Sequence, residues 1–100
     1  MTNLDNICVV AIEECSEIQK EICKAMRFGF DDCNPDKPEH NNAYNIVEEY
    51  LQLQAMMEML DEANVLAKLS EEEKLNIKEE KKEKVKHYAK LSEELGKIKE

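Results

Sequence analysis

The sequence predicts an all-α protein, a helical bundle of three main helices completed by oligomerisation. The 100-residue chain has two Gly, two Pro and no Trp, and 37% of its residues are charged while 42% are hydrophobic. Its apolar residues recur at spacings of three and four, which is the helical period. Capping residues precede the periodic segments. The length suits one domain, so we expect a single helical domain over residues 1–100.

The first predicted helix covers about residues 4–28. We expect Asn3 or Asp5 to cap its start and Gly29 to end it. The stretch FDDCNPDKPEHNN follows, and its Asp, Asn and Pro content predicts a loop over residues 29–41. Loops this long are often functional. The apolar stripe of the helix contains Leu4, Ile7, Ala11, Cys15, Ile18, Ile22 and Ala25.

The second predicted helix covers about residues 42–69, with Asn41 or Asn42 as its cap. Its stripe contains Ile46, Tyr50, Leu53, Met57, Leu60 and Asn64. The third covers residues 70–99 and opens with a capping box, SEEE. The middle of this helix is almost wholly charged, which indicates a solvated face. A narrow stripe in its far half would pack on the bundle or on a second subunit; it contains Tyr88, Leu91, Leu95 and Ile98.

Charge and cysteine content restrict the function classes. The net charge is −9, which argues against binding to a nucleic acid duplex and is compatible with binding a hard metal ion. The sequence has neither an apolar run of membrane-spanning length nor a signal-peptide pattern, so no membrane partner is expected. Four cysteines without a CxxC pair are expected to be reduced core residues of a cytoplasmic protein, with a zinc site as the weaker alternative; they are Cys8, Cys15, Cys23 and Cys33.

Carboxylates on two helices are predicted to face the interior. On a helical wheel, Glu14 lies beside the first apolar stripe, with Glu17 further round, and Glu49 lies in the middle of the second stripe. Burying an unpaired carboxylate is unfavourable, and inward carboxylates on facing helices are how helical bundles hold metals. A divalent cation between them is one explanation. Pairing with Lys or Arg at the edge of the bundle is the other.

The residues together resemble a known family. The stretch EECSEIQKEICKAMRFG, the Asp- and Pro-rich loop and NNAYNIVEEYLQLQAMMEML are similar to short MazG-like nucleoside triphosphate pyrophosphohydrolases, many of them phage-borne. The family motif is ExxE followed by ExxD. Here ECSE at residues 14–17 matches the first half, and EYLQ at residues 49–52 stands at the second. The stretch KKEKVKHYAKLSEELG also resembles the family, so the resemblance spans nearly the whole chain.

The resemblance implies Mg²⁺-dependent hydrolysis of a nucleoside triphosphate to the monophosphate and pyrophosphate. Mg²⁺, or alternatively Mn²⁺, would be held by Glu14, Glu17, Glu49 and Gln52, and the first two glutamates would be catalytic. It further implies a homodimer or homotetramer in the cytoplasm, that of the host if the protein is phage-encoded. Candidate substrate-binding residues, whose positive charges could meet phosphate oxygens, are Lys24, Arg27, Lys78, Lys81, Lys82 and Lys84.

Gln52 departs from the family pattern, which has Asp at this position. A neutral amide is a poorer Mg²⁺ ligand than a carboxylate, so we expect weaker metal binding. Glu21 or Glu48 would compensate, or the enzyme would be slow. The alternative function is a catalytically inactive relative that binds and sequesters a nucleotide.

Overall fold

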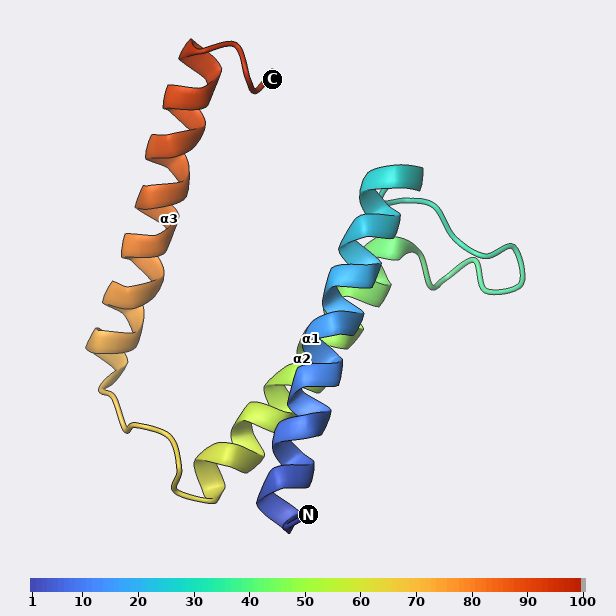
Figure 1. The fold of residues 1–100 in the computed structure, drawn as a ribbon. Helices are drawn as coiled ribbons and strands as arrows, with labels where there is room; N and C mark the ends of the chain where they lie inside the picture. Colours follow the sequence, from blue (N-terminus) through green and yellow to red (C-terminus); the bar gives the residue numbers. More distant parts are fainter. Residues whose placement is uncertain (100) are drawn as a thin grey trace. The chain divides into compact units, whose positions relative to one another are not determined.

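The computed structural model describes residues 1–99, and these form three helices, α1 (Asn3–Phe28), α2 (Asn42–Glu62) and α3 (Glu71–Glu94) (Figure 1). The described residues contain no β-strand beyond one isolated bridge, so the all-α prediction is confirmed. The chain divides into two compact units, Met1–Leu66 and Ala67–Glu100. This division into compact units does not test the prediction of a single domain over residues 1–100, which stays a prediction.

Local signals set both ends of α1. Its N-cap is Thr2 rather than the predicted Asn3 or Asp5, because Thr2 Oγ1 accepts the Asp5 N–H at 3.0 Å and Asp5 Oδ2 accepts the Thr2 N–H at 3.0 Å. This capping box lowers the pKa of the Asp5 carboxyl through its hydrogen bonds to Thr2. The predicted stop at Gly29 is confirmed. Its φ of 103° favours glycine, and its N–H donates to the Ala25 carbonyl at 2.8 Å.

The helices α1 and α2 form an antiparallel hairpin (Figure 1). Its buried residues are few, and the buried apolar residues of the described chain are Ala11, Ala25 and Leu60. Glu21 and Asn42 are also buried. Most of the predicted apolar stripes are therefore partly open, and Ile22 on α1 is 41% exposed. Close packing of two helices with little else over them covers only a narrow strip of each.

The cysteines are free thiols, but the prediction that they lie in the core is wrong. Three of them are exposed on α1, namely Cys8, Cys15 and Cys23, and Cys33 in the loop is half-buried. The buried strip of α1 contains Ala11, Glu21 and Ala25. At about 100° per residue, the three α1 cysteines lie to one side of that buried strip, on the exposed part of the helix.

The predicted loop, residues 29–41, is closed at its base by hydrogen bonds. Asn42 Nδ2 donates to the Gly29 carbonyl at 2.8 Å, and the Asn42 N–H donates to the Asp32 carbonyl at 2.9 Å. Cys33 and Asn41 form an isolated antiparallel bridge. Asn41 is the N-cap of α2, as predicted, since its Oδ1 accepts the Tyr44 N–H at 2.8 Å. The loop therefore leaves α1 and enters α2 at fixed points.

The second helix is shorter than its pattern predicts. The pattern predicts a helix as far as residue 69, but α2 ends at Glu62. The cause is Asn64, whose φ of 61° lies in the left-handed region. Asparagine adopts this conformation more readily than most residues and commonly ends helices in this way. The sequence pattern places Asn64 on the apolar stripe of α2, so the predicted helix runs past this stop signal.

The third helix begins as predicted and ends earlier. Ser70 Oγ accepts the Glu73 N–H at 3.1 Å, and Glu73 Oε1 accepts the Ser70 N–H at 3.3 Å, so the capping box is confirmed. The helix ends at Glu94 rather than residue 99, because Gly96 (φ 74°) turns the chain and the Lys97 N–H donates to the Ser92 carbonyl at 2.8 Å. None of its residues is buried within this unit.

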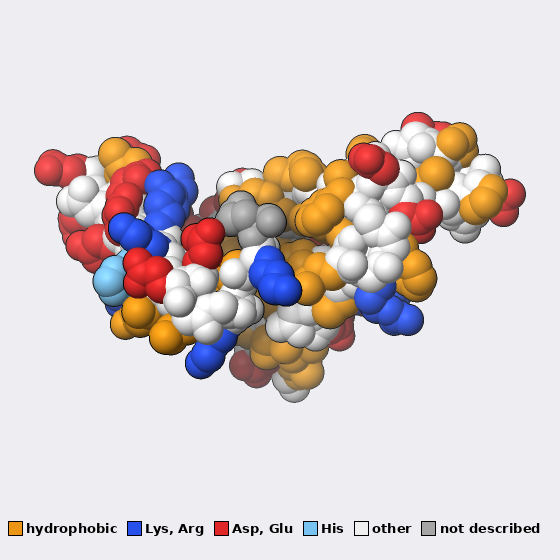
Figure 2. Space-filling view, turned by 90° about the horizontal axis from the view of Figure 1, so that it is seen from above, with side chains coloured by type: hydrophobic (Ala, Val, Ile, Leu, Met, Phe, Trp, Pro, Cys, Tyr) orange, Lys and Arg blue, Asp and Glu red, His pale blue; other side chains and the backbone are white. Residues whose placement is uncertain are grey.

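Large apolar side chains remain open throughout the described residues. Figure 2 shows hydrophobic side chains at the surface in several places. In the first unit Val47 is 55% exposed and Leu51 54%, and on α3 Val85 is 57% exposed. Among residues 1–99, none of the helices combines the length and apolarity that crossing a membrane requires.

Candidate functional site

Two carboxylates from facing helices meet through one amide. In the amide orientation that satisfies both carboxylates, Gln52 Nε2 donates one hydrogen bond to each of them. The nitrogen lies 3.1 Å from Glu14 Oε2 on α1 and 3.2 Å from Glu49 Oε2 on α2. Gln52 lies one turn after Glu49 on α2, so its two N–H groups reach one acceptor on each helix. The structure therefore brings together three of the four residues named as metal ligands, Glu14, Glu49 and Gln52, through hydrogen bonds.

The environment disfavours the charged form of Glu49. Burial raises the pKa of this carboxyl first, and a hydrogen bond with Glu14 raises it further. The negative charges of Glu14, Glu17 and Glu48 act in the same direction. These four glutamates together are called the carboxylate cluster below. Three neighbouring carboxylates thus add to the effect of burial on the Glu49 carboxyl.

The carboxylate cluster is not a preformed metal cage. In residues 1–99 no group of three or more His, Cys, Asp or Glu side chains is arranged to hold a metal ion. Mg²⁺ commonly uses only one or two carboxylates and completes its shell with water and substrate phosphates. The oxygen donors of Glu14 and Glu49 match that chemistry. The assignment of Glu14, Glu17, Glu49 and Gln52 as metal ligands stays a prediction.

A cleft of about 780 Å³ adjoins this cluster in the first unit. Glu48 and Glu49 belong to its wall as well as to the cluster. The rest of its lining comes from the C-terminal half of α1, the loop and the start of α2, and comprises Glu21, Lys24, Phe28, Asp32, Cys33, Asn34, Pro35, Lys37, His40, Asn42 and Asn45. The volume is in the range of small-molecule sites.

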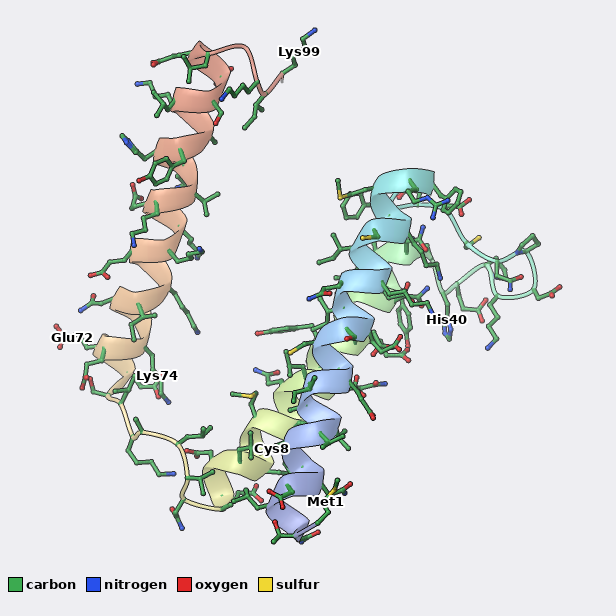
Figure 3. All side chains as sticks on the ribbon, viewed as in Figure 1. Met1, Cys8, His40, Glu72, Lys74 and Lys99 are labelled. Atoms are coloured by element: carbon green, nitrogen blue, oxygen red, sulfur yellow. The ribbon has the colours of Figure 1, made fainter. Side chains whose placement is uncertain are left out.

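Aromatic and charged side chains stand at this cleft. The ring of His40 stacks on that of Tyr44 with centroids 4.3 Å apart and planes 6° apart. Figure 3 shows His40 at the end of the loop, beside the start of α2. Lys24 Nζ lies 3.5 Å from Glu21 Oε2. The cleft beside the cluster is thus lined by both aromatic and charged side chains.

The predicted substrate-binding residues separate into two groups. Lys24 lines the cleft, whereas the Arg27 guanidinium lies 5.0 Å over the Phe28 ring. The four other lysines lie on α3, in the second unit, so their role stays a prediction; they are Lys78, Lys81, Lys82 and Lys84.

Helical patterns alone missed two contributors to the cleft. Asn42 was expected only as a cap, but it is buried and ties the loop to α1. His40 was not singled out. The length and composition of the loop are the only sequence features that point to them. These features indicate a functional loop, but they do not show which of its residues line the cleft.

We expect Glu49 to make folding stability fall as pH rises. A carboxyl with a raised pKa keeps its proton in the folded state at pH values where the unfolded chain has lost it. The loss of stability therefore begins at a pH near 4.5, the ordinary pKa of the carboxyl, and ends at a pH near its raised pKa in the folded state. When urea unfolding is measured at several pH values in this range, the free energy of unfolding should fall less steeply with pH in Glu49→Gln than in the wild type. Glu58→Gln, an exposed change on the same helix, is the control; an unchanged slope in Glu49→Gln would contradict the assignment.

Comparisons with family models, curated proteins and solved structures found no match to this chain. The similarity to MazG-like enzymes therefore remains the resemblance carried by residues 14–17 and 49–52 and the segments around them.

Proposed function

We propose that this protein hydrolyses a nucleoside triphosphate to the monophosphate and pyrophosphate with the help of Mg²⁺ or Mn²⁺. The supporting observation is that the carboxylates of Glu14 and Glu49 meet at the Gln52 amide between two helices, 3.1 Å and 3.2 Å from its nitrogen in the orientation that satisfies both. The sequence resemblance supplies the reaction class.

The donor chemistry fits a hard divalent cation. Glu14, Glu17 and Glu49 offer carboxylate oxygens, and a half-turn of the Gln52 amide would present its oxygen instead of its nitrogen. When bound, such an ion would neutralise triphosphate charge and lower the pKa of a water molecule. The amide hydrogen bonds of Gln52 occupy the same carboxylate oxygens, so cation binding must compete with them.

The protein's own groups have separate tasks in this proposal. Glu14 and Glu49 hold the site together across the two helices. Glu17, one turn after Glu14 and outside the Gln52 hydrogen bonds, accepts the proton of the attacking water. The cleft that shares Glu49 with the cluster receives the nucleoside part of the substrate. Free cysteines accord with the cytoplasmic location included in the proposal.

We expect Glu14→Gln to reduce pyrophosphate release from nucleoside triphosphates at least about a hundredfold, because it removes a carboxylate ligand of the metal ion that the proposed reaction requires. The assay follows pyrophosphate over a panel of ribo- and deoxyribonucleotides with Mg²⁺. Glu13→Gln is the matched control, because Glu13 is the exposed neighbour of Glu14 and should leave the rate unchanged. Absence of pyrophosphate with every nucleotide, or full activity in Glu14→Gln, would contradict hydrolysis.

A catalytically inactive nucleotide binder is the second candidate, and Gln52 is the observation that favours it. Its amide already donates hydrogen bonds to Glu14 and Glu49, which partly stabilises them at the position that a cation would otherwise take. A protein of this kind would bind a nucleotide and release it intact.

Gln52→Asp should distinguish the two candidates. The substitution removes the amide hydrogen bonds and supplies a charged ligand. Because an ionised ligand interacts with a cation more strongly than a neutral one, the affinity for Mg²⁺ should rise about tenfold or more. If the wild type is inactive and Gln52→Asp gains hydrolysis, the binder is supported. Magnesium titration by calorimetry gives the affinity; an unchanged affinity would show that residue 52 is no ligand position.

Self-association is also part of the proposal. The first unit buries few apolar residues, and a groove of about 320 Å³ on α2 is lined partly by Val47, Leu51 and Ala55. An open apolar surface of this kind marks an interaction site. A second copy of the chain would cover it.

Sedimentation analysis should therefore show a dimer or tetramer. Leu51→Lys places a charge in the groove, where burial is unfavourable, so it should shift the protein toward monomer at least about tenfold in dissociation constant. Gln54→Lys adds the same charge at an exposed position on the same helix and should not. A wild type that sediments as a monomer would contradict self-association.

A further inference from the structure

Glu21 is the most unusual group in the cleft. It is only 8% exposed, and its Oε2 is buried and accepts no hydrogen bond from any residue in the described part of the chain. Lys24 Nζ is 3.5 Å from this oxygen, which is an ion-pair distance but longer than an N–H···O hydrogen bond. A buried carboxylate oxygen without a hydrogen bond is unfavourable. The proposed reaction assigns no task to Glu21.

Two features show that a ligand donor can take the place of Lys24. Glu21 lines the cleft, so a molecule bound there stands beside it. The Lys24 side chain is 42% exposed, so it can leave the pair for solvent or for the ligand. An N–H donor that replaces it would complete the hydrogen bonding of Glu21.

The surroundings favour a flat heterocycle as this ligand. Phe28 and His40 both line the cleft, and the His40 ring is already held by stacking on Tyr44. Bases bind proteins by stacking on such rings together with hydrogen bonds to their edges. The cleft also reaches Glu49, where the proposed reaction takes place.

Guanine matches the pair of Glu21 and Lys24. Its N1–H and 2-amino group are adjacent donors that suit one carboxylate, and its O6 and N7 are acceptors for an ammonium group. Adenine and cytosine each present one amino group beside a ring acceptor. Uracil and thymine each present one N–H between two carbonyl oxygens. Guanine alone among these bases offers two neighbouring donors to a carboxylate.

We infer that the cleft between α1, the loop and α2 binds the base of a guanine nucleotide, with Glu21 accepting from N1–H and the 2-amino group and Lys24 donating to O6 or N7. This inference rests on the proposed function for the choice of a nucleotide. It assigns Lys24 to the base rather than to the phosphates, and it makes Glu21 the residue that determines base specificity.

Calorimetry with monophosphates tests this inference apart from hydrolysis. The wild-type protein is titrated with guanosine, inosine and adenosine 5′-monophosphates in buffer containing a chelator. Inosine lacks the 2-amino group, so its monophosphate should bind about tenfold more weakly than that of guanosine, as expected for one hydrogen bond to a charged group. Adenosine monophosphate should bind still more weakly. Equal affinities for the three would overturn the inference.

Glu21→Gln should weaken guanosine monophosphate binding about tenfold or more and leave adenosine monophosphate unchanged or tighter. Asp32→Asn removes one negative charge from the same cleft at an exposed position, so it should affect both nucleotides alike. An unchanged preference in Glu21→Gln would overturn the role of this residue. If circular dichroism shows that this variant does not fold, the inosine comparison on the wild type decides. Guanine-selective binding without pyrophosphate release would refute hydrolysis alone.

Discussion

The repulsion between two carboxylates, and its relief by a single amide, governs the centre of this hairpin. Glu14 and Glu49 face each other from α1 and α2, where like charges would drive the helices apart. Gln52 gives one N–H to each, while burial, the hydrogen bond with Glu14 and the neighbouring negative charges together raise the pKa of Glu49. The site therefore remains attractive to positive charge. This residual field is the property on which any cation or phosphate chemistry here would depend.

The remainder of the first unit supports this arrangement with little apolar packing. Its buried apolar side chains are two alanines and a leucine, which hold the helices close but contribute little buried area. The hydrogen bonds of Asn42 to Gly29 and Asp32 compensate locally by fixing the loop at the end of the hairpin where α1 connects to α2. Polar ties thus position the cleft, while many large apolar side chains of this unit stay exposed.

Much of this organisation could be predicted because it depends on neighbours in sequence. The helical period placed Glu14 and Glu49 toward each other, and the signals at Gly29 and Ser70 act within one turn. The rest depends on residues distant in sequence. Wheel positions could not show that Gln52 bonds Glu14, or that the loop turns Glu21 into the wall of a cleft. The early end of α2 at Asn64 was a local signal hidden by an apparently continuous stripe.

The two anchors of the loop have a consequence for how such a protein can diversify. The chain is tied at Gly29 and Asp32 on one side and at Asn41 and Asn42 on the other. Residues 34–39 lie between these ties, and two of the cleft-lining side chains there are Asn34 and Lys37. Changes in this segment can reshape one wall of the cleft without moving the helix ends. Selection could therefore alter ligand preference through a few loop positions while the opposing glutamates stay in register.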